Sequence, residues 1–223
     1  TDEGTPVDAP SLLDWDQPSP FTGLGGGKDF GNLIHHVFEV LDFTGPDLPG
    51  AVAEILARPI GHRISPEQRS QLPEVLADVL RTPLGSPFAD LRLADLGAGD
   101  RLNELTFHFA LSPEQVLPAG HIGALIADHL DATDPLHAWA LGLKRGLSST
   151  SLQGFLNGSI DLTLRQNVNG TTRYSVVDYK TNNLAPGMAE PTLHSYQPRN
   201  LTRAMADNQY ALQALVYSVA LHR

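Results

Sequence analysis

The sequence predicts an α/β domain, with helices in its first half and a β-hairpin near its C-terminal end. Apolar residues recur at helical spacing in residues 29–43 and again between residues 46 and 82. Residues 155–165 and 174–181 instead alternate apolar and polar positions on either side of Asn169-Gly170, a dipeptide typical of tight hairpin turns. A chain of 223 residues is long enough to bury such a core without disulfide bonds.

Residues 1–28 differ in composition from the rest of the chain. They contain several prolines and the run Gly25-Gly26-Gly27, with few periodic apolar positions. We expect a linker or loosely attached arm here and a single domain over residues 29–223. No strand pattern precedes the glycines and no Gly-Lys-Ser/Thr follows them, which argues against a phosphate-binding loop. The chain starts at Thr1 and stops inside a helical pattern, so we expect a piece of a longer protein.

Charge is unevenly distributed along the chain. The net charge is −10, but residues 144–223 contain eight basic and four acidic residues, a net +4. Such a region can hold phosphates, although an ordinary solvated surface explains the charges equally well. The chain has no Cys, which excludes disulfides, Cys-ligated zinc and iron–sulfur clusters and fits a cytoplasmic protein. No apolar run is long enough to span a bilayer, so we expect no membrane association.

The helix predicted over residues 29–43 carries the first candidate metal ligand. Its apolar stripe places His35 and Glu39, four residues apart, on the neighbouring face. His35 is either a packed or solvated histidine or a metal ligand. A zinc hydrolase using His35, His36 and Glu39 is a weaker alternative, because no His-Glu-x-x-His pattern is present.

Between this helix and the hairpin the sequence predicts further helices and one strand. Helices are expected over residues 48–57, after the N-cap Ser65, over residues 118–130 and over residues 136–145. Residues 101–111 alternate as a half-buried strand, with Glu104 near its start. Glu104 alone is most simply an exposed acid at a strand end.

The hairpin supplies the residues most suited to catalysis. Alternation along the first strand turns Asp161 away from its apolar neighbours, and period two places Asp178 and Lys180 on one face of the second strand. Antiparallel pairing can bring Asp161 opposite that face, and two carboxylates side by side require a neutralising cation. A cross-strand ion pair on the surface is the structural alternative.

The C-terminal part is predicted to be a loop over residues 184–199 and one helix over residues 201–221. The residues expected on its core face are Leu201, Met205, Leu212, Leu215, Val216 and Val219. Tyr210, Gln213 and Tyr217 form a second stripe, which is either the edge of the core or the wall of a groove that meets DNA.

Five short motifs follow one another along the chain. They are G-x-x-x-H-x-x-x-E from Gly31 to Glu39, E-x-x-F from Glu104 to Phe107, G-x-I-D from Gly158 to Asp161, D-Y-K from Asp178 to Lys180 and Q-x-x-x-Y from Gln213 to Tyr217. In this order they resemble the RecB-type family of the PD-(D/E)XK nuclease superfamily. The resemblance runs from roughly residue 29 to the end. It implies a restriction-endonuclease-like core, a mixed central β-sheet flanked by helices, with a helical N-terminal part.

The same resemblance implies a role for each motif residue. Asp161, Asp178 and Lys180 would be catalytic, with Lys180 orienting or activating the attacking water. Mg²⁺, or Mn²⁺ as a substitute, would be bound by oxygen and nitrogen ligands. Those ligands would be His35, Asp161, Asp178 and the main-chain carbonyl of Tyr179. Glu104, Gln213 and Tyr217 would support the site or contact DNA.

The function implied by the resemblance is a Mg²⁺-dependent DNA nuclease domain of a helicase–nuclease. It would hydrolyse phosphodiester bonds during double-strand break processing and recombinational DNA repair. Its partners would be DNA and RecC- and RecD-type subunits, and residues 1–28 would lead from an upstream helicase region. The alternative is a catalytically silent nuclease fold that binds DNA or a subunit, although the complete set of four polar motif residues argues against it.

Overall fold

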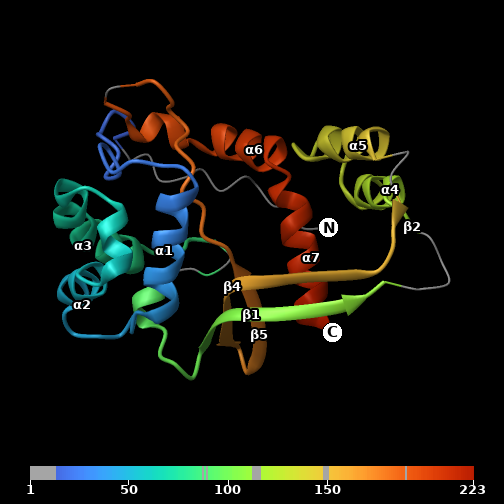
Figure 1. Cartoon of the computed structure of the whole chain (residues 1–223). Coiled ribbons are helices and arrows are strands. Elements are labelled where there is room, and N and C mark those ends of the chain that lie inside the picture. The colour runs from blue at the N-terminus through green and yellow to red at the C-terminus, as the bar shows by residue number, and fades with distance from the viewer. Residues whose placement is uncertain (1–13, 87, 89, 112–116, 148–150, 189) are drawn as a thin grey trace.

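The computed structural model describes residues 14–86, 88, 90–111, 117–147, 151–188 and 190–223, and it places helices around a three-stranded sheet (Figure 1). The strands are β1 (Arg101–Ala110), β4 (Phe155–Val168) and β5 (Thr171–Val177), in the order β1-β4-β5 and antiparallel throughout. The predicted α/β fold class is confirmed. Among the described residues, no helix combines the length and apolarity needed to cross a membrane.

The larger core lies among the N-terminal helices α1 (Lys28–Val40), α2 (Leu48–Leu56) and α3 (Pro66–Arg81), with the short 3₁₀ helices η1 (Pro59–Arg63) and η2 (Leu93–Asp95) beside them. Ser65 caps α3 as predicted, because its hydroxyl accepts from the Gln68 N–H and the Gln68 side chain accepts from the Ser65 N–H. Leu162 and Leu164 of β4 extend into this core. The sheet and the helical part therefore share one apolar interior.

Residues 14–27, the described part of the predicted arm, pack against the domain. The Leu24 side chain is fully buried in the larger core, and Phe21 packs against it. The Ser19 N–H donates to the Pro191 carbonyl at 2.7 Å, and Pro18 bridges Thr192. Loose attachment was therefore the wrong expectation for these residues, while residues 1–13 lie outside the described part.

The end of α1 and the start of β1 are joined by side chains of β1. Arg101 donates to the Leu41 carbonyl at 2.8 Å, and its guanidinium lies over the Phe43 ring. Asn103 donates to the carbonyls of Phe38 and Glu39. These bonds satisfy carbonyls that the last turn of any helix leaves without intrahelical partners.

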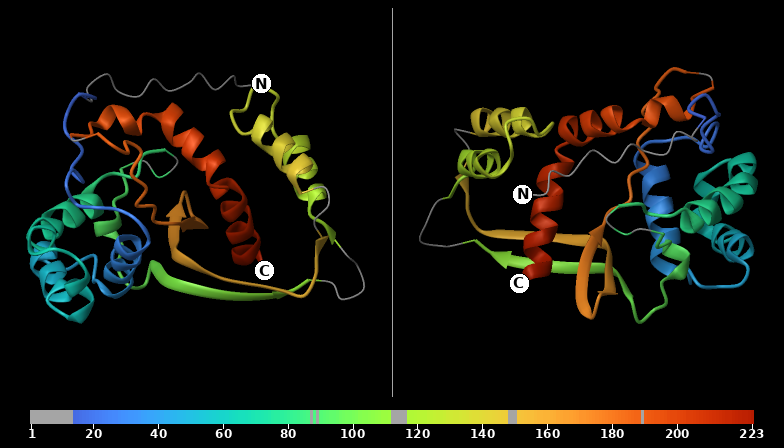
Figure 2. Two further views of the ribbon diagram at one scale, coloured as in Figure 1. Left: turned by 45° about the horizontal axis from the view of Figure 1, so that its top comes forward. Right: turned by 180° about the vertical axis from the view of Figure 1, so that it is seen from behind.

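β1 and β4 form a long ribbon that extends away from the N-terminal helices (Figures 1 and 2). At its far end lie α4 (Gly120–His129) and α5 (His137–Gly146), which pack closely on each other, and the short pair β2 (Leu117–Pro118) and β3 (Ser151–Leu152). One face of the ribbon forms a second, smaller core in which Phe107 and Ile160 pack against Tyr217.

The C-terminal helix predicted over residues 201–221 is two helices, α6 (Pro198–Asp207) and α7 (Tyr210–His222). The chain breaks at Asn208, whose side chain and N–H both bond to the Ala204 carbonyl, and at Gln209, which has a left-handed backbone with φ 59°. Residues 184–199, predicted as a loop, also contain the 3₁₀ helix η3 (Leu193–Tyr196) and the start of α6.

The predicted core face of this helix was only partly correct, because Val216 packs against the second core but Leu201 is 45% exposed. Leu215 and Val219 are 40% and 45% exposed, whereas Tyr217 is buried. Apolar residues occur all around α7, so the periodicity of the sequence did not identify the face that meets the ribbon.

Gly158 provides a test of how tightly this second core is packed. A methyl group at residue 158 would lie 2.5 Å from Cζ of Phe107, and the Phe107 ring is held by stacking on Phe109 and by the edge of Tyr217. We expect Gly158→Ala to lower the free energy of unfolding by about 1–3 kcal/mol, as overpacking does. Urea denaturation measures this change. In the Phe107→Leu background the same substitution should cost less, and an equal cost in both backgrounds would contradict the proposed steric cause.

Candidate active site

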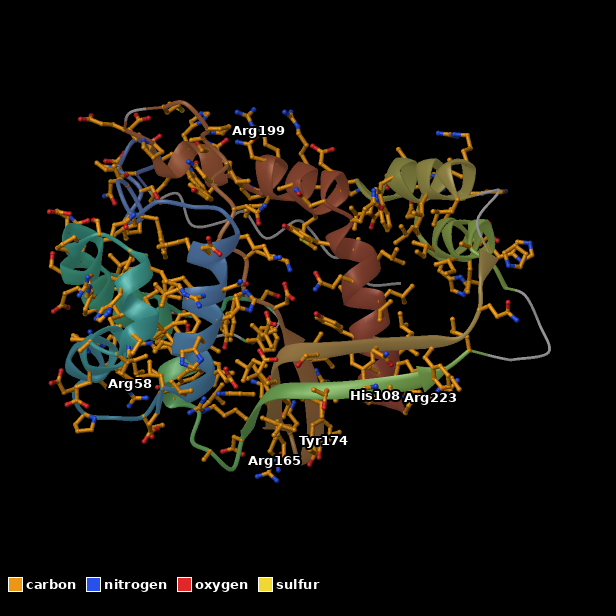
Figure 3. The ribbon with its side chains drawn as sticks, in the orientation of Figure 1. Arg58, His108, Arg165, Tyr174, Arg199 and Arg223 are labelled. Atoms are coloured by element: carbon orange, nitrogen blue, oxygen red, sulfur yellow. The ribbon has the colours of Figure 1, made fainter. Side chains whose placement is uncertain are left out.

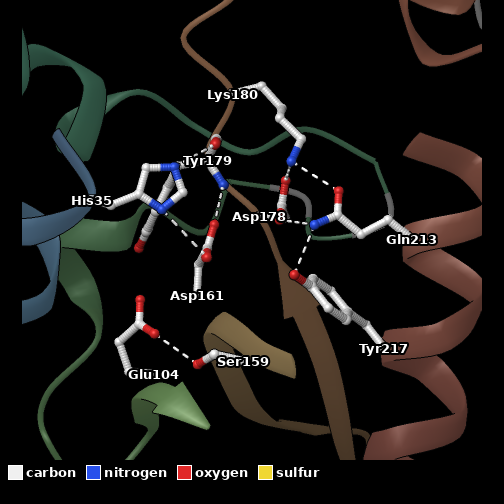
Figure 4. A network of polar contacts seen from close by, with 9 residues as sticks. All are labelled: His35, Glu104, Ser159, Asp161, Asp178, Tyr179, Lys180, Gln213 and Tyr217. Atoms are coloured by element: carbon white, nitrogen blue, oxygen red, sulfur yellow. Dashed lines mark hydrogen bonds and ion pairs between the residues drawn. The ribbon is translucent and has the colours of Figure 1, made fainter. Parts of the chain in front are cut away.

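Polar side chains from five separate segments meet beside the end of β5 (Figure 4). α1 contributes His35, β1 contributes Glu104, and β4 contributes Asp161. The segment after β5 contributes residues 178–180, and α7 contributes Gln213 and Tyr217. Every residue predicted for the site thus lies in one contiguous network.

Both ring nitrogens of His35 face oxygen atoms (Figure 4). Nδ1 lies 3.3 Å from Oδ1 of Asp161, and Nε2 lies 3.0 Å from the Tyr179 carbonyl. The hydrogen bond to Asp161 raises the pKa of His35 above 6.5, and burial only partly opposes it. Two acceptors on the two nitrogens favour the doubly protonated ring.

Residues 178–180 do not continue β5, which corrects the prediction of a strand over residues 174–181. The ladder ends at Val177 because the main chain of Tyr179 is used by the site. Its N–H donates to Oδ2 of Asp161 at 2.9 Å, and its carbonyl meets His35. Gly31 of α1 comes close to this segment, since a Cβ there would lie 3.1 Å from Oγ1 of Thr181.

Asp161 and Asp178 differ in the direction in which the site shifts the pKa of the carboxyl group, and that of Asp161 is lowered. Burial opposes its ionisation, but the hydrogen bonds from His35 and from the Tyr179 N–H outweigh burial and lower its pKa. Asp161 thus remains an oxygen ligand available to a cation throughout the neutral range.

Glu104 has a left-handed backbone, with φ 52°, in the middle of β1. This conformation is uncommon for residues other than glycine and is concentrated at functional sites. The register on either side, with Asn103 paired to Leu162 and Leu105 paired to Ile160, puts Glu104 opposite Asp161. Glu104 also accepts a 2.6 Å hydrogen bond from the Ser159 hydroxyl. Sequence reasoning missed Ser159, although strand alternation places it on the face of Asp161.

The three ligand atoms of His35, Glu104 and Asp161 all lie within 4.8 Å of one another. Two oxygen ligands of one Mg²⁺ are at most about 4.2 Å apart, because each bond is about 2.1 Å long. Small side-chain adjustments would therefore let these groups share one divalent cation. Glu104, predicted to stand behind the metal ligands, lies among the candidate ligands themselves.

Asp178 and Lys180 form an ion pair on the other side of Asp161, and one amide group organises both of them. Oε1 of Gln213 accepts from Lys180 at 2.9 Å, and Nε2 of Gln213 donates to Asp178 at 3.1 Å. Nε2 also donates to the Tyr217 hydroxyl at 2.7 Å. Turning this amide over would place oxygen against carboxylate and nitrogen against ammonium, so its orientation is fixed.

Burial raises the pKa of Asp178, and the nearby charge of Asp161 adds to this, while Lys180 acts in the opposite direction. The ammonium of Lys180 also lies 4.3 Å from the centre of the Tyr210 ring, and the Tyr210 hydroxyl donates to Asn182. The stripe Tyr210, Gln213 and Tyr217 predicted from the sequence therefore faces the site. Burial raises the pKa of the Tyr217 hydroxyl.

The zinc alternative receives no support from this geometry. His36 lies 3.3 Å from Glu39 in an exposed i, i+3 pair on α1. In the part of the chain that the structure describes, the group that could hold a metal is His35, Glu104 and Asp161, without His36 or Glu39.

Comparison with known proteins finds relatives that share one name. The chain is 39% identical over 221 residues to "RecBCD enzyme subunit RecB" of Mycobacterium tuberculosis (strain H37Rv), which is 93% of this chain and 19% of the relative. It is 35% identical over 214 residues to the subunit of the same name from Mycolicibacterium smegmatis and 32% identical over 197 residues to that of Escherichia coli K12. The alignment with the M. smegmatis subunit covers 93% of this chain and 19% of the relative, and that with the E. coli subunit covers 88% of this chain and 15% of the relative.

The chain therefore spans less than a fifth of the length of the curated relatives it matches. No protein-family model matches it. Over most of its length, the chain is thus similar to a part of these RecB subunits.

Proposed function

We propose that this chain is a metal-dependent deoxyribonuclease domain of a RecBCD-type helicase–nuclease. The observation that carries the proposal is the network around Asp161, in which a group suited to a divalent cation adjoins a positioned lysine. The RecB relatives make this combination most consistent with phosphodiester hydrolysis. The domain would comprise residues 29–223 together with residues 14–27, which pack against it, and a helicase region would precede them.

The cation that suits these donors is Mg²⁺, with Mn²⁺ as a substitute, because carboxylate oxygens predominate and one imidazole is present. His35, Asp161 and Glu104 would hold it, and Asp178 and the Tyr179 carbonyl adjoin this group. When bound, the ion would supply Lewis-acid stabilisation of the charge that develops on the scissile phosphate.

Lys180 would position the attacking water and offset charge on the phosphate. Its ammonium has three N–H groups, of which Asp178 and Gln213 accept two. A donor remains for a water molecule or a phosphate oxygen. Gln213 and Tyr217 would hold this arrangement through the amide described above. None of these residues is arranged to read bases, so we expect weak sequence preference.

The proposed substrate is DNA, in double-strand break processing and recombinational repair, and the proposed partners are RecC- and RecD-type subunits. A catalytically silent fold that only binds DNA is the competing proposal. The complete set of His35, Asp161, Asp178 and Lys180 supports the catalytic one, since His35 contacts Asp161, Lys180 contacts Asp178, and the main chain of Tyr179 joins the two pairs.

We expect the chain to cleave linear DNA when Mg²⁺ is present and to lose cleavage when the ion is chelated. Asp178→Ala and Lys180→Ala should each reduce the rate by at least about 100-fold, the scale of positioned acid–base and charge effects. Single-turnover degradation of end-labelled DNA measures this. Asp100→Ala and Lys144→Ala, which alter an exposed carboxylate and an exposed lysine elsewhere, are matched controls.

Equal cleavage by wild type, Asp178→Ala and Lys180→Ala would show that the proposed site is wrong. Binding of DNA by a folded wild-type chain that cleaves nothing, with or without added RecC- and RecD-type subunits, would favour the silent alternative.

Gln213 provides a second test. Gln213→Ala leaves Lys180 and Asp178 without their shared partner, so kcat should fall by up to about 100-fold with little change in KM, since misplacement by ~1 Å costs this much. Tyr217→Phe, which removes only the hydroxyl that accepts from Gln213, should have a smaller effect. Ser218→Ala on the exposed side of α7 should have none. An effect of Gln213→Ala confined to KM would instead assign Gln213 to DNA binding.

Metal binding should depend on pH in a defined direction. Because the pKa of His35 is raised above 6.5, the imidazolium competes with the cation, and the affinity for Mn²⁺ should weaken as pH falls through that pKa. Calorimetry in buffers of different ionisation enthalpy should detect a released proton. His35→Gln should remove this pH dependence, whereas His36→Gln should retain it. A wild-type affinity that stays constant over about pH 5–8, where histidine titrates, would refute the role of His35.

A further inference from the structure

The half of the β1–β4 ribbon that lies away from α1 has two unlike faces. One carries Leu105, Phe107 and Phe109 and packs against α7. On the other face, the register pairs Thr106 with Ser159 and His108 with Asn157, and it pairs Ala110 with Phe155 at the far end. Side chains of directly opposed residues share a face, so these residues form one continuous row. We call Thr106, His108, Phe155, Asn157 and Ser159 the polar track.

The polar track begins at the candidate active site. Residues 155, 157, 159 and 161 of β4 alternate onto one face, so Asp161 lies in line with the track. The Ser159 hydroxyl, the first member, donates to the candidate ligand Glu104. Figure 4 shows Glu104 and Ser159 directly beside Asp161. A polymer whose backbone is held at Asp161 can therefore continue along β4.

The rest of the track is open to solvent. Thr106, His108 and Asn157 are exposed, and Phe155 is 76% exposed, more than any other large apolar side chain among the described residues. His108 stands on β1 within this half of the ribbon (Figure 3), and its Nδ1 lies 2.9 Å from Oδ1 of Asn157. With its oxygen used in this way, the Asn157 amide presents its N–H groups outward.

The chemistry of the track fits a single nucleic-acid strand better than a duplex. Residues 105–111 and 151–160 contain no Asp, Glu, Lys or Arg, in a chain of net charge −10. Along these described strand segments a phosphate backbone thus meets no carboxylate beyond Glu104 and Asp161, and it meets hydroxyl, amide and imidazole donors instead. An exposed phenyl ring offers a stacking surface that any unpaired base can use, while the bases of a duplex are already stacked on each other.

We propose that the polar track binds the single-stranded DNA segment adjoining the scissile phosphate, with an unpaired base stacked on Phe155. The proposal rests on the proposed nuclease function, because it uses Asp161 as the point where the strand is cut. Asp161 lies six positions along β4 from Phe155, a span of about 20 Å at ~3.3 Å per strand residue. This corresponds to roughly six nucleotides at the ~3.4 Å rise of a stacked strand, and to fewer in an extended one.

The test is equilibrium binding of fluorescein-labelled oligothymidylates to the 223-residue chain in EDTA, where cleavage is stopped. Oligomers of about three and about twelve nucleotides are compared, because only the longer one spans the track. Phe155→Ala should weaken binding of the longer oligomer about tenfold, within the range typical for loss of one base–aromatic stack. It should leave the shorter oligomer unaffected.

Two matched controls separate the track from general surface effects. Tyr174 of β5 is 59% exposed, and it pairs with Arg165, which lies on the far side of Asp161 from the polar track along β4. Tyr174→Ala should therefore leave the affinities for the shorter and the longer oligomer unchanged. Thr106→Lys should strengthen binding of the longer oligomer and steepen its salt dependence by about one unit of slope. Thr172→Lys adds the same charge on β5 and should do neither.

The proposal is overturned if Phe155→Ala and Tyr174→Ala weaken oligonucleotide binding equally, or if Phe155→Ala weakens binding of both oligomer lengths. A change in sedimentation of Phe155→Ala with oligonucleotide binding unchanged would also overturn it and assign this face to contacts between copies of the chain. Cleavage assays with Mg²⁺ keep the two proposals distinct. If the chain cleaves DNA but Phe155→Ala has no length-dependent effect on binding, only the proposal of the polar track is disproved. If the chain cleaves no DNA, the proposed nuclease function is disproved instead.

Discussion

The two contacts of the His35 ring connect the helical part of the molecule to its sheet. One nitrogen meets Asp161 of β4, and the other meets the carbonyl of Tyr179 beyond β5. Because the main chain of Tyr179 bonds to His35 and to Asp161, it is withdrawn from the β5 ladder, which ends at Val177. The turn that follows brings Lys180 back against Asp178. The end of the strand and the assembly of the site are consequences of the same few hydrogen bonds.

The site has two parts with different support. His35 and Asp161 lie on α1 and β4, which contribute buried residues to the larger core, whereas Glu104 lies on β1, whose Phe107 belongs to the smaller core. The main chain at Asp178 lies between Val177 and Tyr179, which pack against the larger core, but the side chains of Asp178 and Lys180 bond to Gln213 of α7, whose contacts with the ribbon form the smaller core. Small cores support elements of lower local stability. The acid–lysine part is thus the part of the site whose geometry the docking of α7 can change.

The sequence predicted the fold class, the hairpin and its residues Asp161, Asp178 and Lys180, because alternation, helical spacing and the Asn-Gly turn are local signals. The site roles of His35 and Glu104 came instead from the resemblance to RecB-type nucleases. It did not predict the end of β5, because that end is set by His35, a residue 144 positions away from Tyr179. It also missed the break at Gln209 and the face that α7 buries. Apolar residues surround α7, so only tertiary packing selects Tyr217. The position of Glu104 among the candidate ligands follows from strand register, which spacing alone does not give.

The bonds from Arg101 and Asn103 to the last carbonyls of α1 have a consequence for dynamics. They tie the C-terminal turn of the helix that carries His35 to the first residues of the strand that carries Glu104, so that a local opening of this junction must break these bonds. The spacing between the imidazole of His35 and the carboxylate of Glu104 is thereby constrained by Arg101 and Asn103, whose side chains take no part in the chemistry. Fluctuations of the distant α4 and α5, or of the C-terminal helices, leave that spacing intact. The preorganisation that a small, strongly hydrated cation demands thus originates outside the site, at the junction of α1 with β1.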